Sequence, residues 1–375
     1  MSQRGPMEFW VSAARGTEAA LRDELGELGF GELRIAAGGV RLRGPWEDGW
    51  RACLESRIAQ RVLVSLARFD AADGDSLYAG VRAIDWDPYL TAGHTLAVTG
   101  SCRDSSFRHS GFIALKTKDA IVDQLRDRHG SRPSVARNDP DVHVFVYILN
   151  DRATVYLDLA GVPLHRRGYR TRIGEAPLKE TLAAALLRLA GWDRATPLVD
   201  PMCGSGTIGI EAALWAASIA PGIARPRFGF ERWALHDEAA AARLSALRQE
   251  ARARAHGQAP RILLSDIDPQ AVEDARANAR AAGVRVGFRC CDLADLAWPG
   301  PPALVVTNPP YGERLSAGAE FLRRMASSLC RLHGYRVGVL AGAPAIAKAM
   351  PLRPAQEFPL YNGDIPCRFL LYEVP

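Results

Sequence analysis

The chain has 375 residues, which predicts two or three domains, and its composition (48% hydrophobic, 24% charged) is typical of globular proteins with apolar cores. Its net charge of +5 at pH 7 is compatible with a polyanionic partner but does not require one. Neither a signal-peptide pattern nor an apolar run of 18 residues occurs, so we expect no membrane span. The seven scattered cysteines lack metal-ligand spacing, so we expect free thiols, no metal and a cytoplasmic location.

The first 165 residues or so alternate short strands with helices. Strands are expected at 7–14 and 94–102, helices at 17–29, 76–84 and 111–130, and hairpins at 32–44 and 142–161. This pattern predicts an α+β region with antiparallel sheets in two small units.

From about residue 177 the pattern becomes a regular alternation of strand and helix. The expected strands are 196–200, 261–268, 284–292, 303–308 and 335–342, and the expected helices are 178–191, 206–218, 269–283 and 321–334. This alternation predicts a parallel, doubly wound sheet, closed by an antiparallel hairpin at 353–374 that turns at Asn362-Gly363. The alanine-rich helix 235–255 is expected to be an insertion with a solvated, arginine-rich end.

A glycine-rich turn follows the first strand of this second half. Residues 204–209 match G-x-G-x-x-G, the dinucleotide fingerprint, although a tight strand-to-helix turn needs glycine for structural reasons alone. Asp200 at the strand end would repel a diphosphate, which disfavours NAD. The next acidic strand end, Asp266, lies about 60 residues on instead of ~20, but the helical insertion can by itself explain that gap.

Three successive strands end on carboxylates. Asp200 suits an ammonium group, Asp266 can accept both hydrogen bonds of a ribose diol, and Asp292 can meet an adenine amino group. Because ligands of open α/β sheets bind at the carboxyl ends of the strands, these side chains are expected to share one site. Together with the glycine turn they predict S-adenosylmethionine as the cofactor.

The fourth strand ends in Asn308-Pro309-Pro310-Tyr311. The lone pair of a planar exocyclic amine is delocalised, so the amine is a poor nucleophile. The Asn308 side-chain oxygen and the Pro309 carbonyl can accept its two N–H bonds, the prolines hold that carbonyl rigidly, and Tyr311 can stack on a base. The alternative is a structural turn that ends the strand with prolines.

At this point the motifs resemble a known family. DPMCGSGT, SDIDP and NPPYGERL resemble the amino-group class of Rossmann-like methyltransferases, and LHRRGYRTRIGEAPLKETLAAALL (164–187) narrows the likeness to THUMP-containing bacterial 23S rRNA guanine-N2 methyltransferases. The resemblance implies a ferredoxin-like domain (1–55), a THUMP RNA-binding domain (56–160) and a class I methyltransferase domain (161–375). That last domain would hold a mostly parallel seven-stranded sheet with a C-terminal antiparallel hairpin.

The resemblance also implies roles for particular residues. The cofactor would be held by Asp200, Cys203, Gly204, Ser205, Gly206, Thr207, Asp266, Asp268 and Asp292, with Lys179 and Thr181 closing over its methionine end. The target amine would meet Asn308, Pro309, Pro310 and Tyr311. Two basic clusters could contact phosphate, or could simply be solvated surface: Arg166, Arg167, Arg170 and Arg172, and Arg103, Arg108, Lys116 and Lys118.

The sequence therefore favours methyl transfer from S-adenosylmethionine to a guanine N2 amine of 23S rRNA. A tRNA guanine-N2 methyltransferase is the alternative within the same chemistry. DNA adenine-N6 and protein glutamine methyltransferases share the Asn-Pro-Pro-Tyr motif but do not account for the N-terminal half. A non-catalytic RNA-binding assembly factor is the alternative from another class. Removal of residues 1–160 is expected to leave the cofactor pocket folded.

Overall fold

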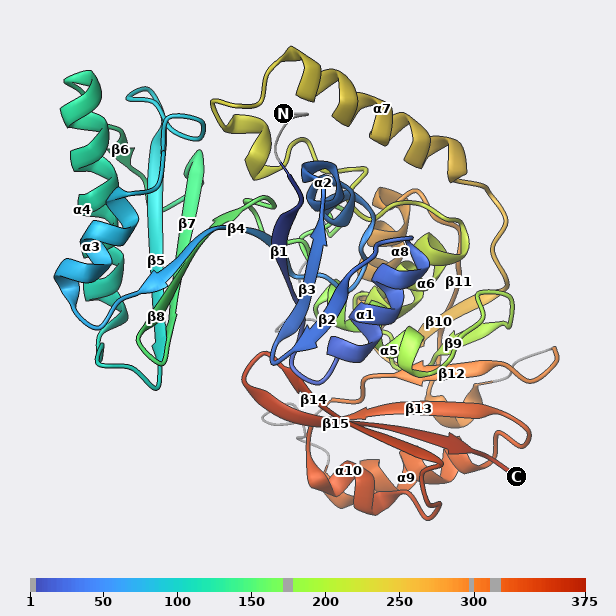
Figure 1. The fold of residues 1–375 in the computed structure, drawn as a ribbon. Helices are drawn as coiled ribbons and strands as arrows, with labels where there is room; N and C mark the ends of the chain where they lie inside the picture. Colours follow the sequence, from blue (N-terminus) through green and yellow to red (C-terminus); the bar gives the residue numbers. More distant parts are fainter. Residues whose placement is uncertain (1–4, 171–177, 297–299, 311–317) are drawn as a thin grey trace.

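The computed structural model describes residues 5–170, 178–296, 300–310 and 318–375, and two sheets organise them (Figure 1). The first sheet has eight strands in the order β2-β3-β1-β4-β8-β7-β5-β6, and the second has seven in the order β11-β10-β9-β12-β13-β15-β14. The predicted class, an α+β region followed by a Rossmann-like α/β domain, is confirmed.

The N-terminal region contains four helices and eight strands within the described residues. The helices are α1 (Glu18–Glu27), α2 (Trp46–Glu55), α3 (Gly74–Arg82) and α4 (Ser110–His129). The strands are β1 (Met7–Ser12), β2 (Leu33–Ala36), β3 (Gly39–Gly44), β4 (Arg61–Asp70), β5 (Thr95–Arg103), β6 (Ser134–Val135), β7 (Val142–Leu149) and β8 (Arg152–Asp158).

Strand β4 joins the two N-terminal units into one sheet. Its first residues, 61–64, pair with β1, and residues 63–70 pair with β8 across a bulge between Ser65 and Ala67. The prediction of separate antiparallel sheets is therefore wrong. It is also wrong in strand direction, because β5 runs parallel to both β6 and β7. The proposed domain limits, 1–55, 56–160 and 161–375, stay a prediction, since β4 contributes to both halves.

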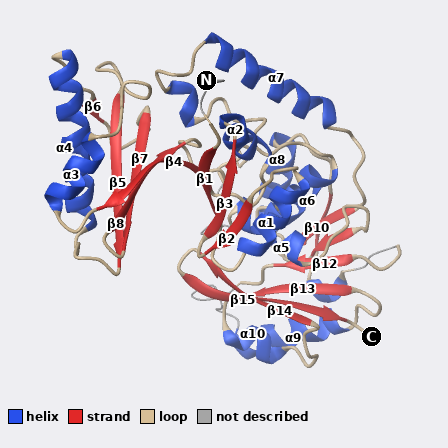
Figure 2. Cartoon of the chain, in the orientation of Figure 1, coloured by secondary structure: helices blue, strands red, loops and turns tan. Residues whose placement is uncertain are grey.

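Within the described residues, helices α1 to α4 pack on one face of this sheet. The alternating residues Phe9, Val11, Val144 and Val146 point to that face and are at most 1% exposed. Gly49 of α2 lies against Phe9, and Gly100 of β5 lies against Ile113 of α4. Figure 2 shows α3 and α4 together on one side of β5 and β7. The opposite face carries the side chains of the alternate positions.

The C-terminal region has the predicted alternation of strand and helix. Its strands are β9 (Leu198–Asp200), β10 (Ile262–Asp266), β11 (Gly287–Cys290), β12 (Leu304–Thr307), β13 (Arg336–Ala341), β14 (Gln356–Asn362) and β15 (Ile365–Glu373). Its helical segments are α5 (Glu180–Leu189), α6 (Thr207–Ala216), η1 (Gly229–Arg232), α7 (Glu238–Arg254), α8 (Pro269–Ala281), η2 (Leu293–Asp295), α9 (Gly318–Cys330) and α10 (Pro344–Ala349).

Strands β9 to β13 of the second sheet are parallel, and β15 runs antiparallel to both β13 and β14. The predicted closing hairpin is thus confirmed, with Gly363 at its turn in the left-handed region (φ 63°). Strand β9 lies between β10 and β12, so the first glycine-rich turn leaves the sheet near its centre.

An excursion from the C-terminal region packs on the N-terminal region. The chain leaves at Ala217 and returns at His256, whose backbone N–H donates to the Ala217 carbonyl (2.9 Å). Between them, residues 218–255 carry η1 and α7, and α7 lies beside α2 along the top of Figure 1. The Phe230 ring stacks on Trp50 at 5.2 Å between centroids. We call residues 218–255 the brace.

Arg225 of the brace fixes the connection between the two regions. Its guanidinium donates to the carbonyls of four residues within 2.7–3.3 Å: Ala160, Val162, Pro163 and Arg166. The side chain is largely buried, and its guanidinium lies 5.5 Å from the Phe228 ring. The predicted insertion is therefore an interdomain contact, and Arg254 at its arginine-rich end pairs with Glu55 of α2.

Candidate cofactor and substrate site

Four neighbouring strands end at one edge of the second sheet. β10 ends on Asp266 and β9 on Asp200, while Asp292 lies two residues after β11 and Asn308 directly after β12. Because these strands are parallel, the four predicted side chains lie along the carboxyl edge, as expected.

Asp200 is the buried member of this group, at 1% exposed. Burial raises the pKa of its carboxyl to about 7, the Asp266 charge adds to this rise, and a hydrogen bond from the Met202 backbone N–H (3.4 Å) opposes it. A cationic group beside Asp200 would favour the ionised carboxylate.

The two glycines of the turn, Gly204 and Gly206, have different surroundings. Gly204 and Gly206 both have positive φ (50° and 81°). A Cβ on Gly204 would meet nothing within 4 Å, whereas one on Gly206 would lie 2.9 Å from the Cβ of Ala275 in α8. Gly204 thus borders open space, and Gly206 allows two helices to approach closely.

The residues beside these glycines are held by the scaffold. The Ser205 carbonyl accepts a hydrogen bond from the Asn278 side chain (3.1 Å). The backbone N–H of Cys203 donates to the Ser265 carbonyl (2.9 Å). Burial raises the pKa of the Cys203 thiol well above its ordinary value, so this sulfur stays protonated.

The other strand-end aspartates also have structural partners. Asp266 accepts from the backbone N–H of Gly204 (2.9 Å) and of Asp268 (3.1 Å), which ties β10 to the glycine turn. Asp268 caps α8 by accepting from the Gln270 N–H (2.9 Å). That bond gives Asp268 a structural function independent of any ligand.

Both carboxylate oxygens of Asp292 already accept hydrogen bonds within the chain, which the sequence did not indicate. One of its oxygens accepts from the Ala294 N–H (2.8 Å) and the other from the Arg324 guanidinium (2.5 Å). Arg324 comes from α9, 32 residues away, so no local pattern could reveal this competition for the carboxylate.

Sequence reasoning missed Ile267, which lies between Asp266 and Asp268. This isoleucine is 67% exposed at the carboxyl edge of the sheet. An exposed aliphatic side chain beside two carboxylates is suited to cover the flat face of a heterocycle. The sequence does hold a signal for it: Ile267 is an apolar residue between two aspartates at the end of a predicted strand.

Lys179 and Thr181 lie at the beginning of α5, where Lys179 is the capping residue. Arg170 brings this end of α5 to the beginning of α6. It donates to the Leu178 carbonyl and to the Thr207 hydroxyl (3.0 Å each) and pairs with Glu180. The buried Thr181 hydroxyl has no hydrogen-bond partner among the described residues. These residues therefore border the glycine turn.

Asn308 carries a buried acceptor. Its side-chain oxygen is enclosed and has no hydrogen-bond partner within the part of the chain that the structure describes. A buried oxygen without a donor costs free energy, so this atom is ready to accept an N–H from a ligand. Pro309 is buried and Pro310 half-buried. Tyr311 lies outside the described residues.

The structure argues against two predicted phosphate contacts, because the Arg167 side chain is buried and that of Arg170 is mostly enclosed. The Arg167 side chain is 3% exposed, donates to the carbonyls of Leu164 and Arg57, and pairs with Glu211. Arg170 is internally paired as described above, with its side chain 11% exposed. Arg166 is exposed, and Arg172 lies outside the described residues.

The second predicted basic cluster is at the surface. Arg103 and Arg108 are exposed, whereas Lys116 and Lys118 lie 3.5 Å and 2.5 Å from the carboxylates of Asp75 and Asp119. Exposed pairs of this kind are weak and do not exclude phosphate contact, so the role of this cluster stays a prediction.

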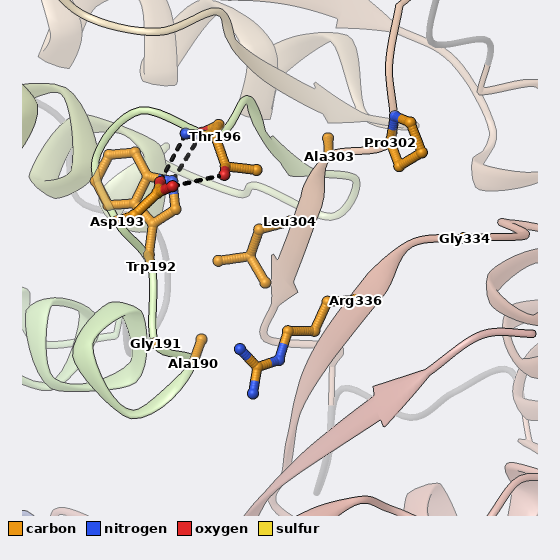
Figure 3. Close-up of a pocket in the computed structure, with 10 residues that line it drawn as sticks. All are labelled: Ala190, Gly191, Trp192, Asp193, Thr196, Pro302, Ala303, Leu304, Gly334 and Arg336. Carbon is orange, nitrogen blue, oxygen red and sulfur yellow. Dashed lines mark hydrogen bonds between the residues drawn. The ribbon is translucent and has the colours of Figure 1, made fainter.

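A separate cavity of about 180 Å³ lies at the opposite edge of the sheet (Figure 3). Leu304 and Arg336, at the beginnings of β12 and β13, line it together with Trp192 and Asp193, which follow α5. Asp193 is occupied by hydrogen bonds from Thr196. The cavity is therefore remote from the carboxyl edge. Among the described residues, no cluster of three His, Cys, Asp or Glu could hold a metal, and no helix is long and apolar enough to cross a membrane.

Comparisons with known families match three segments in chain order. The RlmL ferredoxin-like domain matches residues 8–63, the THUMP domain matches 71–158, and the RMKL-like methyltransferase domain matches 167–370.

Two similar curated relatives are both called ribosomal RNA large subunit methyltransferase K/L. The protein from Syntrophotalea carbinolica is 44% identical over 98% of this chain, and that from Marinobacter nauticus is 43% identical over 98%. These matches cover 54% and 52% of the relatives, so the chain spans about half of their length.

Solved structures agree over nearly the whole chain. The methyltransferase SMU.472 complexed with SAH is 31% identical, with a TM-score of 0.88 and coverage of 100% of this chain and 99% of that one. A protein from Listeria monocytogenes described as a predicted N6-adenine-specific DNA methylase is 32% identical, also with a TM-score of 0.88, over 99% and 97%. The strand-end site, the three matched segments and these relatives establish that the chain belongs to the RMKL-like methyltransferase family, with the ferredoxin-like and THUMP domains of that family at its N-terminal side.

Proposed function

We propose that this protein transfers a methyl group from S-adenosylmethionine to the exocyclic N2 amine of a guanine in 23S rRNA. The observation that carries the proposal is the buried, unpartnered side-chain oxygen of Asn308 at the strand end next to the glycine turn. The names of the curated relatives support ribosomal RNA as the substrate, and the matched THUMP domain supports RNA in general. An rRNA substrate would also agree with the expected cytoplasmic location.

The residues of the carboxyl edge suit S-adenosylmethionine. Asp200 would face the ammonium group, Asp266 the ribose diol and Ile267 the adenine ring, while the open space at Gly204 admits the ligand close to the backbone. The SAH complex of SMU.472 supports a cofactor of this type. When bound, the cofactor supplies an electrophilic methyl group. Further cofactor contacts are proposed for neighbouring residues at the same edge: Cys203, Ser205, Thr207, Asp268, Asp292, Lys179 and Thr181.

Asn308 and the prolines would prepare the acceptor amine. The Asn308 oxygen and the Pro309 carbonyl would each accept one N–H, which holds the amine nitrogen with its lone pair directed away from both acceptors. Proline fixes φ at Pro309 and Pro310, so the second acceptor is positioned before substrate binds. Tyr311 is proposed to stack on the guanine.

The mechanism predicts that Asn308→Ala separates binding from turnover. The variant should bind S-adenosylhomocysteine like the wild-type chain, but methylate 23S rRNA about 100-fold more slowly or worse, because one positioned acceptor is lost. Calorimetry measures the first quantity, and transfer of a labelled methyl group to purified rRNA measures the second. Wild-type turnover in this variant would refute the proposed role of Asn308.

The substrate is tested separately by mass mapping of nucleosides from a deletion strain. Loss of N2-methylguanosine from 23S rRNA alone, restored by the wild-type gene, is the expected result. Loss from tRNA would favour the tRNA enzyme, and loss of N6-methyladenine from DNA would favour the activity named for the Listeria relative. Cofactor binding without any transfer to RNA would favour the assembly factor.

A further inference from the structure

The helix-free face of the N-terminal sheet carries a row of aromatic rings. Side chains of directly paired residues point to the same face, and β8, β7 and β5 pair Tyr156 with Phe145 and Phe145 with Thr99. The next row on this face pairs Thr154 with Tyr147, and Tyr147 with Ser101. The rings of Phe145, Tyr147 and Tyr156 are therefore neighbours across two strands, on the side opposite α3 and α4.

These rings are accessible to a degree that core residues are not. Tyr147 is 36% exposed and Leu149, two residues on, is 39% exposed, while Phe145 and Tyr156 are half-buried. The intervening Val146 and Ile148 are at most 1% exposed, because they face the helices. The exposed rings thus lie on the face opposite the helices, which is open at Tyr147 and Leu149 and closed at Asp158 (1% exposed).

Arginines surround this aromatic row. The strand register directs seven arginine side chains to the same face: Arg34, Arg41, Arg43, Arg61, Arg68, Arg103 and Arg152. The same register directs three carboxylates there: Glu8, Asp70 and Asp158. Glu8 pairs with Arg68 and Asp158 with Arg61, and two carboxylates beside the strands, Glu32 and Asp104, pair with Arg43 and Arg103. With seven arginines against these five carboxylates, the face still carries an excess of positive charge.

We propose that this face, defined by the three rings and seven arginines, binds an unpaired stretch of RNA. The proposal rests on the proposed function, which supplies RNA as the substrate, and it adds the binding surface and the form of RNA. Base faces would stack on Tyr147 and its neighbouring rings, and phosphates would pair with guanidinium groups. An RNA duplex covers its base faces by stacking, so exposed rings on an open sheet favour single strands.

The test uses the full chain and a fluorescent 12-nucleotide single-stranded RNA, with binding followed by anisotropy at several salt concentrations. Tyr147→Ala should weaken binding roughly 5- to 150-fold, the effect of losing one stacked base. Arg152→Glu should weaken binding and reduce the slope of log K against log salt by about 0.7 or more. Matched controls lie away from this face and from Lys116 and Lys118: Arg126→Glu near the end of α4, and Tyr335→Ala, at a half-buried ring that precedes β13 of the second sheet.

Several results would overturn the proposal. Both face variants could bind the single-stranded RNA with wild-type affinity, or the control variants could lose as much affinity as the face variants. The wild-type chain could bind a 12-base-pair RNA duplex more tightly than the single strand. Polyglutamate could displace the fluorescent RNA as effectively as unlabelled RNA does. The last outcome would indicate an acidic protein partner. Methyl transfer to 23S rRNA by the wild-type chain is measured in the same preparations. If transfer occurs but the face variants bind normally, this surface fails and the proposed function stands. If no transfer occurs, the proposed function fails, and the anisotropy data still decide the surface.

Discussion

At the scale of single residues, Asp200 links the chemistry of the site to pH. Burial raises the pKa of its carboxyl to about 7, and a ligand ammonium would compete with the proton. We expect the affinity for S-adenosylhomocysteine, which keeps the ammonium group, to fall about tenfold between pH 8 and pH 6, as the ionised fraction of Asp200 falls. Calorimetry of the wild-type chain and of Asp200→Asn measures this, and the variant should bind weakly without that dependence.

The same carboxyl predicts a stability effect with a definite sign. The folded-state pKa lies above the ordinary value of 3.8, so the folded chain holds this proton more tightly than the unfolded chain. The contribution of Asp200 to stability is therefore present at low pH and is lost as pH rises from about 4 to about 7. Asp200→Asn should raise the melting temperature more at pH 8, where the whole loss has occurred, than at pH 5, where only its first part has. An equal shift at both values would contradict a titration effect.

At the scale of elements, α7 shows how an apparently solvated helix is anchored. Its residues Ala240, Leu244, Leu247 and Ala251 are at most 4% exposed and pack in the cluster that contains Trp46 and Trp50. We expect Leu244→Ala to lower the free energy of unfolding by about 2–5 kcal/mol, through lost burial and a cavity. Denaturant unfolding measures it, with Gln249→Ala on the exposed side of α7 as the control. A loss no larger than that of the control would mean that α7 detaches freely.

The sequence predicted those elements whose evidence is local. The carboxylates and Asn308 at the strand ends, the helices between them and the closing hairpin follow from periodicity, caps and turns within a few residues. The sequence analysis predicted neither β4 nor α2. Strand β4 is defined by its pairing with β1 and β8, which lie far from it along the chain. Arg167 was mistaken for a surface residue for the same reason, since Glu211 lies 44 residues away.

At the scale of the whole molecule, the brace makes the two regions interdependent. Phe228, Phe230, Trp233, Leu244 and Leu247 are at most 3% exposed and belong to the same apolar cluster as the N-terminal core. Removal of residues 1–160 would expose these side chains and would also remove the Ala160 carbonyl that Arg225 binds. The structure therefore argues against the expectation that the catalytic region folds alone. We expect residues 161–375 to aggregate when expressed, as judged by size-exclusion chromatography and thermal melting.

A redesigned fragment can separate misfolding from lost recognition. Since His256 donates to the Ala217 carbonyl, the two ends of the brace are adjacent, and a short Gly-Ser turn can replace residues 218–255. This fragment, 161–375 without the brace, should be monomeric, melt cooperatively and bind S-adenosylhomocysteine, because the carboxyl edge lies outside the deleted segment. It should fail to methylate 23S rRNA, because the proposed RNA-binding face is absent. A stable 161–375 fragment that retains its brace would show that the apolar cluster does not couple the two regions.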